Sequence, residues 1–292
     1  MPSQPTLHAE GGVVLRLRRD EDEDLARFAV ETDGTVVGEV ILRRLADRRA
    51  EVSWAVRPEH RGRGHATAAV RRLVTYAFEE LDIQRVEARA EPGNYASLRV
   101  AARAGLRREG RLRAHGTTGD ERRDYLLFAR LADDPDVRER DGFIGILNSN
   151  LPRKRVISQG LLRDRRGRIL LCELTYKREW DLPGGVVEPD ESPADGLRRE
   201  IREELGIEVA IQGLRTVNWL PAWGGWDDAC VFVFDLGVAE SQVVDRMALQ
   251  SAEIRGVHWC DGDIVRDRAT AVTIELLDAL KRGAPAYREH GR

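Results

Sequence analysis

The sequence predicts two domains that each mix helices with strands, of the α+β and α/β classes. Three observations support this prediction. The 292 residues are 42% hydrophobic and 33% charged, which is a globular composition with enough length for two domains of ordinary size. Each half of the chain combines runs typical of strands with apolar residues at helical spacing. Between the halves lies the polar, turn-rich stretch "LADDPDVRERDGFIGILNSNLPRKR". We therefore expect domains at 12–133 and 151–285, joined by a linker at 134–150.

The first half begins with strand patterns and continues with a long helix. Runs rich in β-branched and alternating apolar residues predict the strands, which are 12–19, 27–32, 35–44, 50–57, 84–90 and 125–131. Apolar positions at helical spacing predict helices at 64–81 and 94–105. Asn94 fits the N-cap of the shorter helix, and Gly105 fits its C-terminal stop.

The second half has the same kinds of element around one central helix. Its predicted strands are 155–164, 168–176, 217–220, 229–236 and 255–260. The central helix is expected to start after Ser192, a capping hydroxyl, with Pro193 at the first helical position. It is expected to end at Gly206. A terminal helix is predicted at 269–282.

Charge and composition exclude several classes of protein. The net charge of −3 and the pI near 6.1 argue against nucleic acid or a membrane surface as the partner. No apolar run approaches the roughly 18 residues of a membrane span. The odd set Cys172, Cys230 and Cys260, without a CxxC, fits reduced thiols in a cytoplasmic protein. The stretch 1–12 lacks the features of a signal peptide, and we expect it to be a disordered lead-in.

A glycine-rich turn, Arg61-Gly62-Arg63-Gly64-His65-Ala66, connects the strand that ends near Val56 to the long helix. Glycines allow backbone conformations in which successive N–H groups point at one spot. The N-terminus of the following helix adds positive potential there. The turn therefore predicts a phosphate cradle that needs no lysine.

Over residues 12–132 the chain resembles the GNAT family of N-acetyltransferases, especially the branch that acetylates protein N-termini. The resemblance lies in the R-x-x-G-x-A turn and in "EPGNYASLRVAARAGL". It implies that acetyl-CoA is a cosubstrate, with its pyrophosphate near Val56 and the amides of Arg61, Gly62, Arg63, Gly64, His65 and Ala66. It places Asn94 and Ser97 beside the pantetheine end of the cofactor. It also makes Glu51 a candidate catalytic base, Tyr95 a candidate acid, and an amine, either a small molecule or a protein N-terminus, the acceptor.

One departure from the GNAT pattern concerns the amine acceptor. The family usually places two helices after its first strand, where they wall the acceptor site. Here only nine residues separate Arg18 from Phe28, which is room for one short helix. The acceptor pocket is then open, completed by the other domain, or lost, and in the last case acetyl-CoA could be a sensed ligand.

The central helix of the second half concentrates carboxylates on one face. Glu200, Glu203 and Glu204 stand at i, i+3 and i+4, so their side chains are neighbours and repel one another. A cation among them would relieve the repulsion. All-oxygen ligands favour Mg²⁺ or Mn²⁺, which bridge phosphate oxygens and lower the pKa of a bound water.

These carboxylates lie in a longer pattern, G-x5-E-x7-R-E-U-x-E-E-x-G-U, which the chain matches at every position. The matching residues are Gly185, Glu191, Arg199, Glu200, Ile201, Glu203, Glu204, Gly206 and Ile207. Residues 153–284 thus resemble the Nudix hydrolases, an α/β/α sandwich family that hydrolyses nucleoside diphosphates linked to another group. The resemblance makes Glu200, Glu203 and Glu204 the metal ligands, with Glu203 or Glu200 also activating water. It implies that Glu191 pairs with Arg199 and that Gly185 allows the loop backbone to bend.

The nucleotide itself is less well defined by the sequence. Trp219, Trp223 and Trp226 either stack on a base or anchor a loop. Pro221 lies near the place where ADP-ribose-cleaving relatives carry a proline. The arginine motif of CoA-cleaving members is missing ahead of the matched pattern Gly185–Ile207, which is called the Nudix box, or the box, below.

Three interpretations follow from the sequence. The first is a bifunctional acetyltransferase and pyrophosphohydrolase. The second is a Nudix hydrolase whose GNAT-like half only binds acetyl-CoA as a sensor or scaffold. The third, a regulator with a Nudix-like ligand module, is disfavoured by the complete box.

Overall fold

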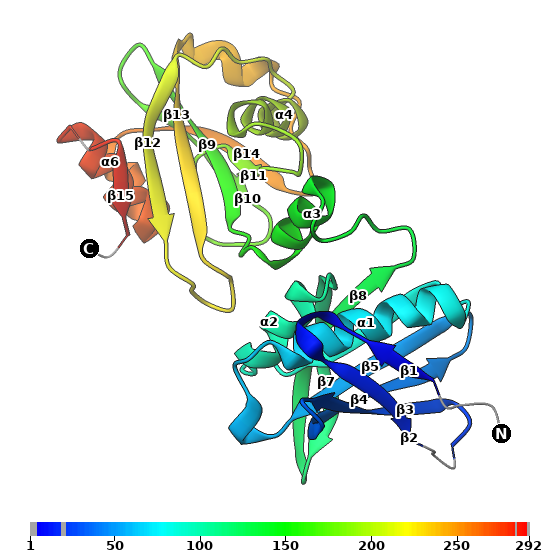
Figure 1. Ribbon diagram of the computed structural model, residues 1–292. Helices are drawn as coiled ribbons and strands as arrows, with labels where there is room; N and C mark the ends of the chain where they lie inside the picture. Colours follow the sequence, from blue (N-terminus) through cyan, green and yellow to red (C-terminus); the bar gives the residue numbers. More distant parts are fainter. Residues whose placement is uncertain (1–4, 19–21, 284, 291–292) are drawn as a thin grey trace. The chain divides into compact units, whose positions relative to one another are not determined.

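The computed structural model describes residues 5–18, 22–283 and 285–290. The chain divides into two compact units, Met1–Pro152 and Arg153–Arg292, which are labelled by element in Figure 1. Each unit is described by itself.

The first unit is built on one eight-stranded sheet within the described residues, with the order β1-β2-β3-β4-β5-β6-β8-β7. Its strands are β1 Thr6–His8, β2 Val14–Arg18, β3 Leu25–Thr32, β4 Thr35–Leu45, β5 Arg49–Val56, β6 Arg85–Ala90, β7 Arg107–Thr118 and β8 Glu121–Leu131. Neighbouring strands are antiparallel except for the parallel pair β5–β6. The helices are α1 His65–Glu80, α2 Tyr95–Arg103 and α3 Arg140–Asn150, with short 3-10 turns at Glu10–Gly12 and Pro58–His60.

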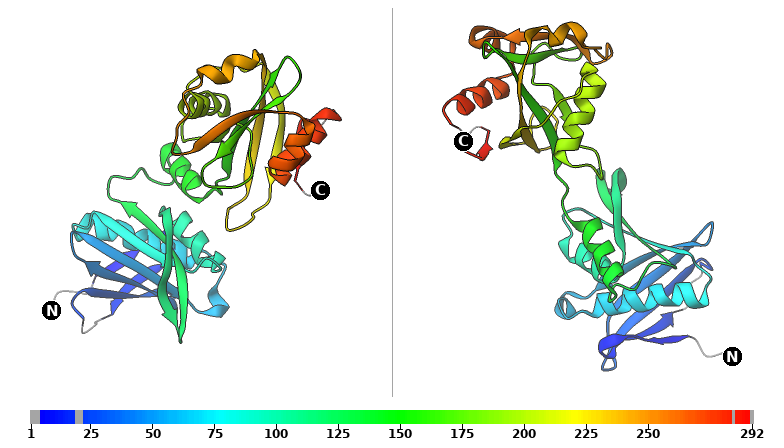
Figure 2. Two further views of the ribbon diagram at one scale, coloured as in Figure 1. Left: turned by 180° about the vertical axis from the view of Figure 1, so that it is seen from behind. Right: turned by 90° about the horizontal axis from the view of Figure 1, so that it is seen from above.

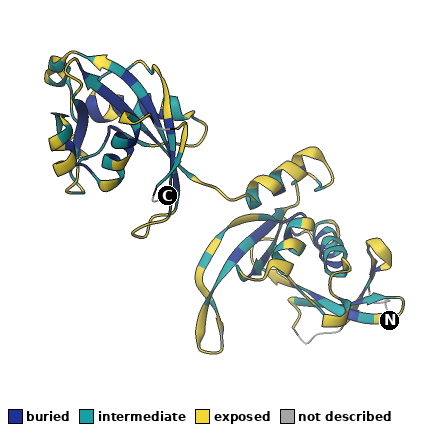
Figure 3. Cartoon of the chain, turned by 90° about the vertical axis from the view of Figure 1, so that its left-hand side faces the viewer, coloured by how far each residue is buried: buried dark blue, intermediate teal, exposed yellow. Residues whose placement is uncertain are grey.

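Helix α1 covers one face of this sheet. Its buried residues Val70, Leu73 and Val74 recur at helical spacing and pack against strand side chains such as Phe28 and Leu42. Figure 3 shows the resulting alternation of buried and exposed positions along the strands. The apolar stripe of α1 thus fixes the helix, and the turn before it, against the strand from which it follows.

Strands β5 and β6 diverge along their length. They pair from Arg49 to Glu51 and from Arg85 to Glu87, and in the described residues the pairing goes no further. The ends of β5 and β6 are therefore free to lead into the turn before α1 and into α2. This divergence leaves room for a ligand between the two segments.

Two expectations for the first unit are corrected. The lead-in expected to be disordered over 1–12 holds strand β1, paired with β2, and Leu7 is buried in the core; residues 1–4 lie outside the described residues. The predicted linker 134–150 contains α3, which packs on β7 and belongs to the first unit. Local patterning missed both because β1 is only three residues long and α3 has a weakly segregated apolar face.

The second unit has a seven-stranded sheet in its described part, with the order β14-β10-β9-β13-β12-β15 and with β11 paired to β9. Its strands are β9 Arg155–Asp164, β10 Ile169–Leu174, β11 Gly184–Val186, β12 Gly213–Leu220, β13 Ala229–Ala239, β14 Ile254–Cys260 and β15 Tyr287–Glu289. Its helices are α4 Pro193–Leu205, α5 Gly262–Arg268 and α6 Ala271–Lys281, with a 3-10 segment at Ser241–Arg246.

Two hydrophobic clusters lie on opposite faces of this sheet. Helix α4 packs on one face through Leu197, Ile201 and Leu205. Helices α5 and α6 cover the other through residues such as Val265 and Leu276. Figure 2 gives two further views of this arrangement within the unit. The predicted α/β/α sandwich is confirmed.

The predicted bounds of α4 are also confirmed. The Ser192 side chain accepts a hydrogen bond from the Asp195 amide, and Gly206 ends the helix with a φ of 67°.

The expectations about the cysteines and about membrane spans can be compared with the structure. Cys172, Cys230 and Cys260 are all free thiols, and Cys172 and Cys260 are buried. Among the described helices, none combines the length and the apolarity needed to cross a bilayer.

Candidate active sites

The first unit has a cavity of about 410 Å³ between the end of β5, the glycine-rich turn and α2. Most of the residues predicted to bind acetyl-CoA line it, namely Val56, Arg61, Gly62, Gly64, His65, Ala66, Asn94 and Ser97. Arg63 lines a neighbouring cavity of about 310 Å³ instead. Residues separated by more than thirty positions in the sequence thus meet around one space.

The backbone of the turn has the conformation that the glycines predict. Gly62 and Gly64 have φ values of 78° and 86°, in the left-handed region. Gly64 is the N-cap of α1 and offers no side-chain oxygen to the first-turn amides, which therefore remain available to a ligand. The Arg61 Nε donates to the Val56 carbonyl at 3.0 Å and fastens the turn to the strand.

On the α2 side, Asn94 has two roles. It lines the cavity, and its Oδ1 accepts a hydrogen bond of 3.1 Å from the Ser97 amide as the helix N-cap. Tyr95 is 68% exposed and does not line the cavity, so the structure gives no support to it as the acid.

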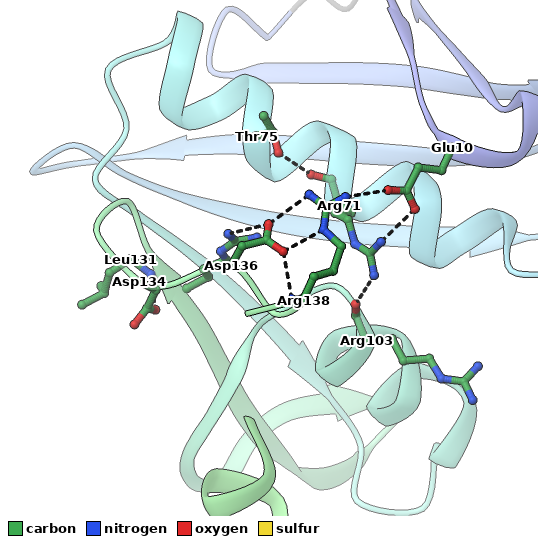
Figure 4. A network of polar contacts seen from close by, with 9 residues as sticks. Glu10, Arg71, Thr75, Arg103, Leu131, Asp134, Asp136 and Arg138 are labelled. Atoms are coloured by element: carbon green, nitrogen blue, oxygen red, sulfur yellow. Dashed lines mark hydrogen bonds and ion pairs between the residues drawn. The ribbon is translucent and has the colours of Figure 1, made fainter. Parts of the chain in front are cut away.

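Sequence reasoning missed the arginines of α1 and α2 that border these cavities. Arg103 lines both, and Arg71 lines the smaller one. Arg71 donates to the Arg103 carbonyl at 2.7 Å and to the Glu10 carboxylate at 2.9 Å (Figure 4). Helical spacing placed Arg71 and Arg103 on helices, but only the packing of α1 beside α2 brings them together.

Glu10 extends this network to the segment after β8. Its carboxylate also pairs with Arg138, which holds Asp136 (Figure 4). The hydrogen bonds from Arg138 lower the pKa of Asp136 to about 2. The network ties the N-terminal segment and the approach to α3 onto α1.

Glu51, the predicted base, lies outside the cavity lining. Its carboxylate accepts a 2.6 Å hydrogen bond from Arg89, two residues beyond the Glu87 that pairs with Glu51, and both side chains are about a quarter exposed. The other end of the Arg89 guanidinium contacts His115 of β7. Glu51 is therefore engaged in an ion pair at the point where the two strands begin to diverge.

The region expected to wall the amine acceptor is short. Strands β2 and β3 are direct antiparallel neighbours, with Arg18 opposite Arg27. Between them the described residues 22–24 form a turn and no helix; residues 19–21 lie outside the described part. The predicted departure from the two-helix pattern holds for the residues that the structure describes.

The three predicted metal ligands of the second unit differ in their environment. Glu204 is only 5% exposed, and its carboxylate accepts a hydrogen bond from the Gly184 amide at 3.3 Å. Burial, with the Glu200 charge nearby, raises the pKa of Glu204 to about 7. Burial also raises the pKa of Glu200. The Glu203 side chain is 54% exposed.

Arg199 organises the box around these carboxylates. It grips Glu191 through two hydrogen bonds, of 2.7 and 3.2 Å, and donates to the Val186 carbonyl at 3.0 Å. The predicted Glu191–Arg199 pair that fixes the loop against the helix is confirmed. The same guanidinium reaches Glu200 at 3.0 Å and Glu203 at 3.1 Å.

Gly185 leaves space that the Glu200 carboxyl fills. A Cβ on Gly185 would lie 2.5 Å from Glu200 Cδ. Gly184, with a φ of 132°, has the Ser158 carbonyl oxygen 2.1 Å from its own Cβ position. The double glycine thus lets β11 approach both β9 and α4.

The donor set fits a hard divalent cation in its chemistry, because the oxygens are anionic, crowded and in one case buried. In the described residues, however, no group of three acidic, His or Cys side chains is arranged closely enough to enclose an ion. Arg199 takes the neutralising position between Glu200 and Glu203. Metal ligation by these residues therefore stays a prediction.

A carboxylate far outside the box also faces this site. Glu253 adds to the electrostatic field that raises the pKa of Glu204 and of Glu200. The segment before β14 lies along the end of α4, because the Gln250 amide donates to the Glu204 carbonyl at 3.0 Å. No motif identifies Glu253, since only the tertiary fold brings it beside the box.

The tryptophans of the β12–β13 turn are anchored by polar contacts. The Arg155 guanidinium lies 5.1 Å from the Trp223 ring centre and 4.9 Å from that of Trp226. Trp219 donates to Asp228 at 3.2 Å. These contacts support the loop-anchor alternative, and Pro221 lies in the same turn.

Comparison with known proteins assigns a family to each unit. Family models match an acetyltransferase (GNAT) domain over residues 4–107 and a NUDIX domain over residues 153–280. A MutT-like protein of Streptomyces ambofaciens is 35% identical over 125 residues, 42% of this chain and 75% of that protein. The probable N-acetyltransferase YjcK of Bacillus subtilis is 33% identical over 124 residues, 41% of this chain and 68% of that protein.

A shorter match lies in the box region. The CTP pyrophosphohydrolase of Escherichia coli is 46% identical over 52 residues, which are 16% of this chain and 38% of that protein. The chain thus spans between 38% and 75% of the length of these relatives.

Fold, sites and relatives together define a two-domain enzyme with a transferase unit and a hydrolase unit. The chain belongs to the GNAT acetyltransferase family through its first unit and to the NUDIX family through its second.

Proposed function

We propose that the chain is a bifunctional enzyme, an acetyl-CoA-dependent N-acetyltransferase fused to a Mg²⁺-dependent pyrophosphohydrolase of a nucleoside diphosphate derivative. Two observations support the proposal. The glycine-rich turn lines a cavity, and Glu200 and Glu204 of the box lie against the double glycine Gly184-Gly185.

In the hydrolase unit, Glu200, Glu203 and Glu204 would hold Mg²⁺ or Mn²⁺. When bound, such a cation would neutralise phosphate charge and make a water molecule more acidic. Arg199 keeps Glu200 and Glu203 together against their mutual repulsion. Glu203, the more exposed, or Glu200 would accept the proton of the attacking water as the phosphoanhydride bond breaks. Glu204, which is buried, would hold the cation from the inner end of the site.

The substrate class follows from the family and from its relatives. A relative named as a CTP pyrophosphohydrolase shares the box region, which supports a nucleotide with a phosphoanhydride bond. Because this match is confined to 52 residues around the box, it supports recognition of the diphosphate part of the substrate and does not identify the base. The tryptophan turn, already held by Arg155, is a weaker basis for base recognition.

In the transferase unit, the free amides from Gly62 to Ala66 would hold the pyrophosphate of acetyl-CoA. Asn94 and Ser97 would line the path toward the acetyl group. Glu51 stays the candidate base because it stands where β5 and β6 diverge. For Glu51 to accept a proton from the amine, its ion pair with Arg89 would have to open.

A second candidate function has its own supporting observation. The turn between β2 and β3 leaves no helical wall for an amine acceptor in the described residues. The GNAT unit would then bind acetyl-CoA as a sensor or scaffold and transfer no acetyl group. Acetyl-CoA consumption in the presence of amines and peptides separates the two candidates.

The test of the hydrolase is product release from a nucleotide panel with Mg²⁺, comparing the wild type with Glu203→Gln. We expect the variant to lose hydrolysis while its acetyl-CoA affinity, measured by calorimetry, is unchanged. Hydrolysis that survives in Glu203→Gln would refute the metal assignment. Cleavage of no compound by the wild type would refute the pyrophosphohydrolase.

A further inference from the structure

The Ser158 hydroxyl is a buried polar group without a partner. Ser158 is 0% exposed, and its Oγ has no hydrogen bond in the described part of the chain. Buried hydroxyls in folded proteins are normally hydrogen-bonded, because an unpartnered one has lost its water without compensation. An exception of this kind suggests a partner that the free protein lacks.

The side chain of Ser158 points to the face of the sheet that carries α4. Successive residues of a strand alternate between faces, so Ser158 shares its face with Gly160 and Leu162. Leu162 belongs to the α4 cluster, and a Cβ on Gly160 would lie 3.3 Å from Ile201 Cδ1 of α4. Ser158 therefore places a hydroxyl next to Gly160 and Leu162 on the α4 face of β9.

The strand register brings this hydroxyl beside Glu200. Ser158 lies directly opposite Gly185 in the β9–β11 pair, and opposite residues have Cβ positions about 5 Å apart on the same face. The Cβ position of Gly185 is itself 2.5 Å from Glu200 Cδ and 2.7 Å from Glu200 Oε2. The Glu200 carboxyl and the Ser158 side chain are thus neighbours over β9 and β11.

One oxygen of Glu200 is available for such a contact. Arg199 donates to Oε1, whereas Oε2 accepts no hydrogen bond from any described residue. A carboxylate that ligates a cation is commonly oriented by a hydrogen bond to its other oxygen. A neutral hydroxyl suits that place better than a second guanidinium, because it adds no positive charge near the cation.

We propose that Ser158 is a positioning residue of the hydrolase site, whose hydroxyl donates to the Glu200 carboxylate when that carboxylate holds a divalent cation. The inference rests on the proposed metal-dependent hydrolase. It adds a residue that lies 27 positions ahead of the Nudix box and that no motif includes.

The test is Mn²⁺ binding to the full-length protein by calorimetry, without nucleotide, for the wild type and Ser158→Ala. We expect Ser158→Ala to bind Mn²⁺ about tenfold more weakly, as for other losses of a hydrogen bond to a metal ligand. We also expect the unfolding midpoint of the metal-free variant not to fall, because the hydroxyl removed makes no hydrogen bond in the free protein.

A matched control separates metal binding from packing. Thr216 is equally buried in the same sheet, and its hydroxyl donates to the Pro285 carbonyl at 2.9 Å. Thr216→Val should lower the unfolding midpoint and leave Mn²⁺ affinity unchanged. Ser158→Cys, which keeps a weaker donor, should fall between the wild type and Ser158→Ala in Mn²⁺ affinity.

The outcomes distinguish this inference from the proposal on which it rests. Equal Mn²⁺ affinity of the wild type and Ser158→Ala, with Glu200→Gln impaired, would overturn the role of Ser158 alone. A wild type that binds no Mn²⁺ would overturn the metal-dependent hydrolase itself. A lowered midpoint of metal-free Ser158→Ala with unchanged affinity would mark the hydroxyl as purely structural.

Discussion

Among single residues, Gly185 controls the space that the Glu200 carboxyl occupies in the hydrolase site. Any Cβ there would meet the Glu200 carboxyl, with Oε1 at 2.6 Å, and the flexible carboxyl would move rather than the backbone. We predict that Gly185→Ala folds normally but hydrolyses its nucleotide about 100-fold more slowly, the scale of a catalytic group displaced by about 1 Å. The measurements are steady-state hydrolysis and circular dichroism.

The matched control for this substitution is Gly213→Ala in β12. Gly213 has no atom within 4 Å of its Cβ position, so the same added methyl group is accommodated there. Hydrolysis by Gly213→Ala should equal that of the wild type. Full activity of Gly185→Ala would mean that Glu200 does not need the place it occupies in this structure.

Glu204 makes the stability of the metal-free protein depend on pH. Burial raises its pKa to about 7 in the fold from its usual value of 4.5, so folding disfavours its charged form. The contribution to stability is therefore present below pH 4.5 and is lost as the pH rises through 7. We predict a loss of about 3 kcal/mol from this group in EDTA. Denaturant unfolding of the second unit at several pH values measures it.

Glu204→Gln is the control for that dependence, because glutamine does not titrate and keeps an oxygen for the Gly184 amide. The variant should lack the wild type's loss of stability between pH 4.5 and 7. Mg²⁺ should reduce the loss in the wild type, since a cation favours the charged carboxylate. Equal pH dependence of the two proteins would contradict the raised pKa.

Residues that act through local sequence could be predicted, and residues that act through the tertiary fold could not. Arg199 and Glu191 are eight positions apart and pair as the box implies. Ser158 lies beside the same site only because of the register of β9 with β11. Glu253 lies near it only because the segment before β14 runs along the end of α4.

At the scale of elements, the proposed binding of acetyl-CoA depends on the start of α1. Gly64 caps the helix with a φ of 86° and lines the cavity, and its Cβ position is open. We predict that Gly64→Glu weakens acetyl-CoA binding on the order of 100-fold, because a carboxylate next to a pyrophosphate repels it. Calorimetry with acetyl-CoA measures the loss.

Backbone strain alone could also weaken binding, and Gly119→Glu controls for it. Gly119, in the turn between β7 and β8, has a φ of 61° and an equally open Cβ position, but it lies outside the cavity lining. Its variant has comparable left-handed strain, about 1 kcal/mol, without an anion in the cradle. Unchanged affinity of Gly64→Glu would refute the cradle.

Elements with a clear periodicity of apolar residues could be predicted from the sequence. Elements stabilised mainly by neighbouring elements could not. Helices α1 and α4 match their predicted ranges closely because caps and apolar spacing agree. Strand β7 was missed because Arg107–Thr118 is rich in arginine and is a strand through its pairing with β8. The sequence of α3 predicts a linker because its polar ends resemble a loop.

At the scale of the whole molecule, each unit has a complete core of its own. One hydrophobic cluster lies entirely within Met1–Pro152, and two lie within Arg153–Arg292. The units are 152 and 140 residues long, lengths at which a domain buries enough surface to fold alone. We therefore predict that each unit folds when produced separately, with unfolding measured by circular dichroism.

The same division tests whether acetyl-CoA regulates hydrolysis. The second unit contains every predicted metal ligand, so Arg153–Arg292 alone should hydrolyse the nucleotide at the rate of the full chain without acetyl-CoA. If the enzyme is bifunctional, acetyl-CoA leaves the full chain's hydrolysis unchanged. If the first unit is a sensor, acetyl-CoA changes hydrolysis by the full chain and not by the fragment. A folded fragment without hydrolysis would contradict independence, because the hydrolase would then need a contribution from the first unit.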